Sequence, residues 1–275
     1  GLRLRGREPR GPVGRGRHAP RLGDGAPWRD GGVARLRPPP PGGVGLPDAA
    51  GPPVAGPVGA GDAVRRADGK AIMEYHKIET LYERDEKTFK VKPGILKNRT
   101  YGLLKTWEWT EKIDGTNIRC LWHGGQLTFG GKTDAAQIHA DLIAWLYTNI
   151  TGENMKAIFP DVDAIIYGEG YGAGIQKGGG YSPTKRFIVF DVLVDGKWWL
   201  SWENVCDVAS KLKLETVPFI GSMTLEEATE MIRAGFTSKI GNGTVKAEGL
   251  VGRPAETLFD KKGHRLITKL KTKDF

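Results

Sequence analysis

The chain has 275 residues, enough for one large domain or two small ones, and a formal net charge of +9. Its two cysteines, Cys120 and Cys206, are too few for a disulfide scaffold and lack the spacing of metal ligands. No apolar stretch approaches the length of a membrane span, so we expect no membrane partner and a soluble protein of a reducing compartment, the cytoplasm.

Residues 1–72 differ sharply in composition from the remainder. They contain 17 Gly and 12 Pro but no Ser, Thr, Asn, Gln, Phe, Tyr, Cys or Met. Such a segment cannot bury enough apolar surface to offset chain entropy, so we expect it to be disordered. The abrupt change in composition before Met73 favours upstream sequence translated past the true start over an Arg/Gly-rich arm that grips RNA.

The basic charge is concentrated in this first segment. It holds 13 of the 41 Lys and Arg and 6 of the 32 Asp and Glu, which leaves 28 basic and 26 acidic residues in 73–275. The remaining chain is therefore nearly neutral, and the high pI is weak evidence for nucleic-acid binding by its folded part.

The first elements after Met73 are predicted strands and one helix. Residues 107–110 and 117–122 have strand character, and the second strand turns through His123-Gly124-Gly125 into a third at 126–129. Over 134–150 the apolar residues recur at helical spacing, which predicts a helix.

The second half of the chain continues this mixture of short strands and helices. A capping box, Thr224-Leu225-Glu226-Glu227, predicts a helix that ends near Ala234. Strands are predicted at 164–167, 187–194, 246–251 and 265–271, and a further helix at 203–212. Modest helices among antiparallel turn signals indicate an α+β fold for residues 73–275.

Residues 111–117 read E-K-I-D-G-T-N and contain a lysine that could act as a nucleophile. A lysine amine attacks only when it is deprotonated, so it needs burial or neighbouring cations that lower its pKa from about 10.4. Lys112, followed by the tight Asp114-Gly115 turn, could be held in a pocket in this way. The alternative is an ordinary hairpin with a solvated lysine. The heptapeptide alone leaves both interpretations open.

Five motifs, in this order, resemble those of the RNA ligase family in the covalent nucleotidyltransferase superfamily of ATP-dependent ligases and capping enzymes. The phage and bacterial small RNA ligases are the branch it looks most like. The motifs are K-I-D-G-T-N at 112–117, Y-G-E-G at 167–170, F-I-V-F-D-V at 187–192, A-E-G-L-V at 247–251 and L-I-T-K-L-K-T-K-D-F at 266–275. The resemblance implies an ATP-grasp-like adenylyltransferase domain of antiparallel sheets flanked by helices.

The resemblance also implies roles for individual residues. Lys112 would attack ATP and carry AMP, Glu169 would contact the ribose, and Phe190 would pack on adenine. Glu248 would serve Mg²⁺ (or Mn²⁺) and the reacting lysine, and Lys269 and Lys271, on one face of a strand, would bind phosphate and lower the pKa of Lys112. The implied catalytic residues are Lys112, Glu248, Lys269 and Lys271, and the implied ATP-binding residues are Glu111, Lys112, Asp114, Gly115, Asn117, Lys132, Glu169, Phe190, Glu248, Lys269 and Lys271.

Two departures from the family pattern bear on the substrate. RNA ligases of this branch commonly have an arginine where Gly130-Gly131-Lys132-Thr133 offers lysine. Lysine keeps the positive charge but lacks the planar, forked guanidinium group of arginine. The chain also ends four residues after Lys271, so we expect no C-terminal domain, and an unknown protein partner could supply one.

The sequence predicts an ATP-dependent RNA ligase that joins 5′-phosphate and 3′-hydroxyl ends of RNA or of a nicked duplex. Asn117, where DNA ligases usually have arginine, favours RNA. We expect Asn117, Lys132 and the loop around Lys177 to place the acceptor end. The alternatives are a minimal ATP-dependent DNA ligase and a non-catalytic module that retains the nucleotide pocket.

Overall fold

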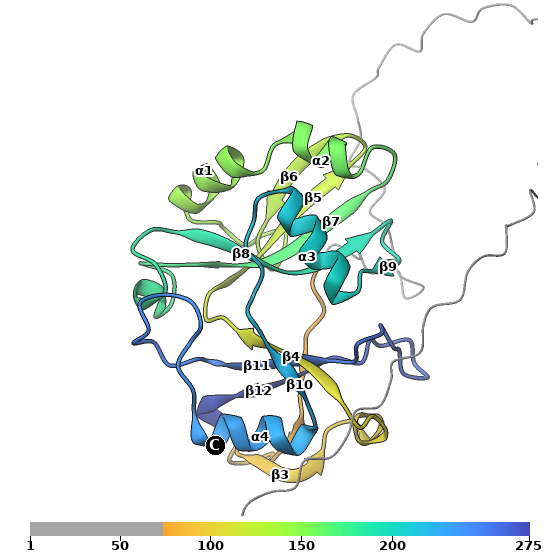
Figure 1. The fold of residues 1–275 in the computed structure, drawn as a ribbon, viewed down its shortest axis with the longest axis vertical. Helices are drawn as coiled ribbons and strands as arrows, with labels where there is room; N and C mark the ends of the chain where they lie inside the picture. Colours follow the sequence, from red (N-terminus) through yellow and green to blue (C-terminus); the bar gives the residue numbers. More distant parts are fainter. Residues whose placement is uncertain (1–73) are drawn as a thin grey trace, which may run out of the picture. The chain divides into compact units, whose positions relative to one another are not determined.

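The computed structural model describes residues 74–275, so the disorder expected for residues 1–72 lies outside the described residues. Two five-stranded sheets organise this region (Figure 1). The first has the strand order β1 (Glu79–Thr80), β12 (Thr268–Lys271), β11 (Gly249–Arg253), β4 (Trp107–Lys112) and β10 (Phe219–Met223). In it, β1 pairs with β12 in parallel and the other neighbours pair antiparallel.

The second sheet is antiparallel throughout. Its strands lie in the order β6 (Gln126–Gly130), β5 (Thr116–His123), β7 (Ala164–Tyr171), β8 (Arg186–Val194) and β9 (Trp198–Trp199). A two-stranded ribbon of β2 (Tyr82–Arg84) and β3 (Val91–Leu96) precedes β4. Short 3₁₀ helices occur at η1 (Arg99–Leu103), η2 (Gly178–Gly180) and η3 (Thr272–Asp274).

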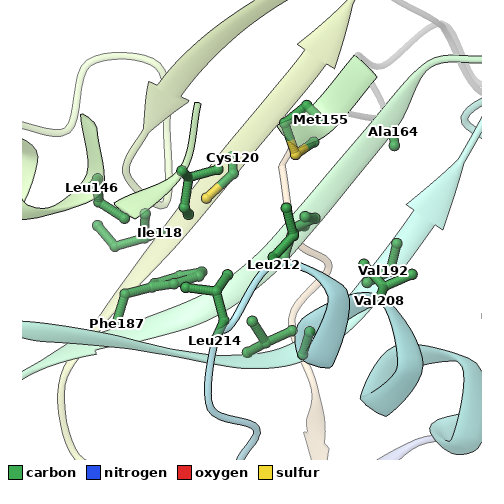
Figure 2. Packing of buried hydrophobic residues seen from close by; sticks show 14 of the residues in the cluster. Ile118, Cys120, Leu146, Met155, Ala164, Phe187, Val192, Val208, Leu212 and Leu214 are labelled. Atoms are coloured by element: carbon green, nitrogen blue, oxygen red, sulfur yellow. The ribbon is translucent and has the colours of Figure 1, made fainter. Parts of the chain in front are cut away.

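Helices cover one side of each sheet and form a separate core with it. Side chains of α1 (Ala140–Asn149), α2 (Gly152–Ile158) and α3 (Trp202–Lys211) pack against the second sheet, as Figure 2 shows for residues such as Leu146, Met155 and Val208. Against the first sheet, α4 (Leu225–Ala234) packs Ile232 beside Trp107 and Trp109. Burial of each large apolar side chain is worth about 1.5–3 kcal/mol, so these two cores hold the sheets rigidly enough to position a site.

The structure confirms the α+β fold of antiparallel sheets flanked by helices. The capping box of α4 is present, because Glu227 N donates to Thr224 Oγ1 at 3.1 Å and Thr224 N donates to Glu227 Oε2 at 2.8 Å. None of the helices in residues 74–275 combines the length and the apolar character needed to cross a membrane.

The predicted helix over 134–150 is wrong at its start, since α1 begins at Ala140. The guanidinium of Arg119 binds the preceding loop, with Nε 2.7 Å from the Gly131 carbonyl oxygen and Nη2 2.8 Å from Asp134 Oδ1. These contacts hold 131–134 outside the helix. Six elements have no strong local sequence pattern and were not predicted, because each is short or contains Gly or Pro: β1, β2, β3, β9, β10 and α2.

Candidate active site

The segment that contains Lys112 passes from one sheet to the other. Lys112 is the last residue of β4 in the first sheet, and β5 begins at Thr116 in the second. The hairpin alternative is therefore wrong, because β4 and β5 do not pair with each other. Gly115 is needed here for close approach, since a Cβ would lie 2.2 Å from the Gly170 carbonyl oxygen of β7.

Lys112, Glu248 and Lys271 form a compact ion cluster at this crossing. Glu248 Oε2 lies 2.6 Å from Lys112 Nζ, and Glu248 Oε1 lies 2.8 Å from Lys271 Nζ. The sheet register explains the proximity, because Gly249 pairs with Lys112 on one side and with Lys271 on the other. Burial alone would raise the pKa of the Glu248 carboxyl, but the two ammonium groups outweigh it and hold that pKa below its usual value.

Lys269 and Glu169 beside this cluster have strongly shifted pKa values. Burial, reinforced by repulsion from Lys271 and Lys112, lowers the pKa of Lys269 to about 8. Burial also raises the pKa of Glu169 to about 8, against the attraction of Lys112 and with the help of the Glu248 and Asp114 carboxylates. Shifted groups gathered at one place are typical of active sites.

A cavity opens beside Lys112, between residues of both sheets. Five of the predicted ATP-binding residues line it: Glu111, Lys112, Asn117, Glu169 and Phe190. Its other lining residues are Tyr75, Ile78, Thr110, Ile113, Val217, Val251 and Arg253. These lining residues give the cavity an apolar, aromatic wall with a lysine at its edge. In the sheet beside it, Gly168 of β7 permits close packing, because a Cβ there would lie 2.3 Å from the Phe187 ring.

Three buried polar atoms of the cavity lack a hydrogen-bond partner within residues 74–275. They are Oε1 of Glu111, Oδ1 of Asn117 and Nε of Arg253. Buried polar groups are nearly always paired in folded proteins, so three unpaired atoms on residues that line one cavity indicate a polar ligand. Two acceptors and one donor beside aromatic Phe190 fit a purine nucleoside such as that of ATP.

Tyr75 closes the cavity from the segment that precedes β1. Its ring centroid lies 5.0 Å from that of Phe190, and its hydroxyl donates to Asp191 Oδ2 at 2.8 Å. Asp191 is fully buried and also accepts from Arg265, so the tyrosine is fixed by an ion pair. Neither Tyr75 nor Arg253 was among the residues predicted from the sequence. Tyr75 lies far from any recognisable motif, whereas Arg253, an arginine within an apolar strand, was a signal that could have been used.

The remaining predicted residues lie around the cavity. Asp114 and Gly115 belong to the crossing segment, and Glu248, Lys269 and Lys271 lie near Lys112 without lining the cavity, so their contacts with ATP stay predictions. Lys132 is exposed in the loop after β6 and does not line the cavity, so its contact with ATP stays a prediction.

Residues 74–275 contain no group of three His, Cys, Asp or Glu side chains arranged to hold a metal ion. Mg²⁺ in nucleotide sites often takes only one or two carboxylates, with phosphate oxygens and water as its other ligands. The carboxylates of Asp114 and Glu248 lie near enough to Glu169 to raise its pKa. The donor set therefore fits an ion that arrives with phosphate and does not fit an all-protein metal site.

A model of the RNA ligase family matches residues 105–271. No curated protein matches the chain. Two apo mutants of a Naegleria gruberi RNA ligase are similar in fold. The first has a TM-score of 0.55 and 17% sequence identity, and the match covers 74% of this chain and 56% of that one. The second has a TM-score of 0.55 and 16% sequence identity, and the match covers 77% of this chain and 58% of that one. A mutant of that ligase with AMP and Mn has a TM-score of 0.51 and 18% identity, covering 70% and 60%. The chain thus spans less than two-thirds of these proteins.

Proposed function

This chain belongs to the RNA ligase family, and we propose that it is an ATP-dependent RNA ligase that acts through a covalent lysyl-AMP intermediate on Lys112. The observation that carries the proposal is the Lys112–Glu248–Lys271 cluster, with separations of 2.6 Å and 2.8 Å, beside a cavity whose lining residues include aromatic side chains and three unpaired polar atoms. The Naegleria gruberi relatives, solved with AMP and Mn, support ATP and a divalent metal as its cofactors. We further propose that residues 73–275 form the adenylyltransferase domain.

In the first step the Lys112 nitrogen forms a bond to the α-phosphorus of ATP, the bond to the bridging oxygen breaks, and pyrophosphate leaves. Lys112 must first release a proton to water. Glu248, which remains ionised because its pKa is held low, fixes the direction of the Lys112 amine. Lys269 and Lys271 supply positive charge where negative charge builds up on the phosphates.

The base and ribose would occupy the cavity. Phe190 and Tyr75 provide its aromatic wall, and Glu111, Asn117 and Arg253 offer the open polar atoms. At neutral pH Glu169 is largely protonated, because its pKa is about 8, and it can donate to a ribose hydroxyl as well as accept from one. A Mg²⁺ or Mn²⁺ ion, when bound, would offset phosphate charge, with Glu248 as its expected protein ligand.

In the later steps AMP passes from Lys112 to the 5′-phosphate of a nucleic acid, and a 3′-hydroxyl then displaces AMP to form the phosphodiester bond. RNA at the acceptor end is the expected preference, since a pocket that reads the terminal ribose distinguishes RNA from DNA by the 2′-hydroxyl.

The test is self-adenylylation with α-labelled ATP and Mg²⁺, followed by sealing of a 5′-phosphorylated nick. We expect acid-labile label on the wild type and on Lys156→Ala, an exposed residue of α2, but none on Lys112→Ala. Sealing should be better with a ribonucleotide than with a deoxyribonucleotide at the acceptor end. Persistent label in Lys112→Ala refutes the proposed nucleophile. Nucleic-acid binding without any label would indicate a binding module, and equal sealing of a deoxy end would indicate a minimal DNA ligase.

A further inference from the structure

Two adjoining cavities form a groove that leads away from the Lys269–Lys271 edge of the site. The nearer cavity, of about 410 Å³, is lined by Lys77, Ile78, Glu79, Thr80, Arg84, Lys97, Lys269, Lys271 and Lys273. The farther one, of about 830 Å³, shares Lys77, Glu79 and Lys97 with it and continues past η1 to the loop between β11 and β12. We refer to the two together as the basic groove.

The basic groove concentrates positive charge that the composition of the chain conceals. Ten Lys and Arg line it against two acidic residues, Glu79 and Asp260, although residues 73–275 as a whole are nearly neutral. Cations gathered along a groove raise the electrostatic potential there. The near-neutrality of residues 73–275 as a whole therefore does not prevent strong attraction of a polyanion to the groove.

Six of these ten cations are not neutralised by neighbouring acids. The other four form ion pairs: Lys77 with Glu79, Arg84 with Asp274, Arg265 with Asp191, and Lys271 with Glu248. Among residues 74–275, by contrast, no carboxylate oxygen lies within 4.0 Å of the side-chain nitrogens of Lys97, Arg99, Lys261, Lys262, Lys269 or Lys273. Like charges held together without counterions favour a ligand that brings several negative charges.

The far end of the groove is an ordered hairpin that presents both cations and an aromatic ring. Asp260 Oδ1 accepts from the backbone of Lys262 at 2.8 Å and of His264 at 2.9 Å, and Phe259 forms a β-bridge with Arg265. In Figure 1 this loop, in dark blue, extends beyond the ends of β11 and β12. The Phe259 ring is 51% exposed in the groove, available for stacking of a base.

We propose that the basic groove binds the single-stranded donor RNA, with its 5′-phosphate at Lys269 and Lys271 and the following nucleotides running past Arg99 to the Phe259–Lys262 hairpin. The donor is the strand that fits, because its 5′-phosphate must meet AMP on Lys112, next to Lys271. A triphosphate could be held by the near end alone, whereas unpaired cations spread along the groove, with one exposed ring at its far end, match the repeated phosphates and a base of a strand. The inference rests on the proposed function.

The experiment compares full-length Lys261→Gln/Lys262→Gln with the matched control Lys156→Gln/Lys211→Gln, which removes the same charge from exposed residues of α2 and α3. Binding of a 5′-phosphorylated single-stranded RNA is titrated over a range of salt concentrations. Two lost phosphate contacts should reduce the slope of log K against log salt by about 1.4. Phe259→Ala should weaken binding at least about fivefold, through loss of one base stack. The control should behave as the wild type.

Unchanged RNA affinity and slope in Lys261→Gln/Lys262→Gln would overturn the inference. Equal losses in RNA binding and in self-adenylylation, a reaction without RNA, would place ATP in the groove and would overturn it as well. A loss of affinity in Lys132→Gln/Lys177→Gln instead would put the strand on a different surface. Wild-type protein that never becomes labelled with AMP would refute the proposed function itself, so the two failures are distinguishable.

Discussion

Replacement of Gly115 by alanine tests whether the crossing between the two sheets requires a residue without a side chain. The added Cβ would lie 2.2 Å from the Gly170 carbonyl oxygen and 2.8 Å from Glu169 Cγ, and ordinary contact begins near 3.4 Å. The crossing segment and β7 would therefore have to separate by about 1.2 Å. Overpacking of this kind costs about 1–3 kcal/mol, which lowers the Tm of a domain of this size by about 2–12 °C.

The same displacement should impair chemistry more than stability. Reacting groups must approach to about 3–3.5 Å, and a misplacement of about 1 Å costs on the order of 100-fold in rate. We therefore expect the single-turnover rate of self-adenylylation, measured with labelled ATP, to fall by about 100-fold in Gly115→Ala.

Gly179→Ala is the matched control. No atom lies within 4 Å of its added Cβ, and its φ is outside the left-handed region, so both Tm and rate should stay close to those of the wild type. If Gly115→Ala also keeps the wild-type Tm and rate, the reasoning from close approach is refuted.

Three further perturbations probe the site. Because the pKa of Lys269 is lowered to about 8, its charge is lost as pH rises, and kcat/KM for self-adenylylation of the wild type should fall relative to that of Lys269→Arg between pH 7 and pH 9. The pKa of Glu169 is raised to about 8 in the folded state, so its stabilising contribution is complete below about 4.5 and is lost as pH rises through 8. Between pH 5 and pH 9 the free energy of unfolding, measured by thermal melts, should therefore fall by about 4 kcal/mol more in the wild type than in Glu169→Gln. A chain that starts at Met73 should self-adenylylate as the full chain does, whereas a start at Lys77, which removes Tyr75, should raise the KM for ATP several-fold.

Much of the site could be predicted from the sequence because its parts are short local motifs. Lys112, Glu248 and Lys271 lie in three motifs that the sheet register brings together, and alternation along β12 already indicated that Lys269 and Lys271 share a face. The α4 capping box is equally local, because both partners lie within four residues of the chain.

Other features depend on contacts between distant segments, which no local pattern encodes. Asp114-Gly115 has the composition of a hairpin turn, but Gly115 serves the approach of β7, more than fifty residues later in the chain. Tyr75 lines the cavity because its hydroxyl donates a hydrogen bond to Asp191, and Arg265 holds Asp191 in place through an ion pair. The basic groove likewise joins the segment before β1, η1 and the β11–β12 loop, and its charge disappears in a total over the sequence.

The most direct test of the central claim is to locate AMP on the protein. The wild type is incubated with ATP and Mg²⁺, digested without exposure to acid, and its peptides are analysed by tandem mass spectrometry. The account predicts one adenylylated peptide, with AMP on Lys112, that is discharged when pyrophosphate or a 5′-phosphorylated RNA is added. AMP on another residue, such as Lys269 or Lys271, or no adenylylated peptide at all, would contradict it.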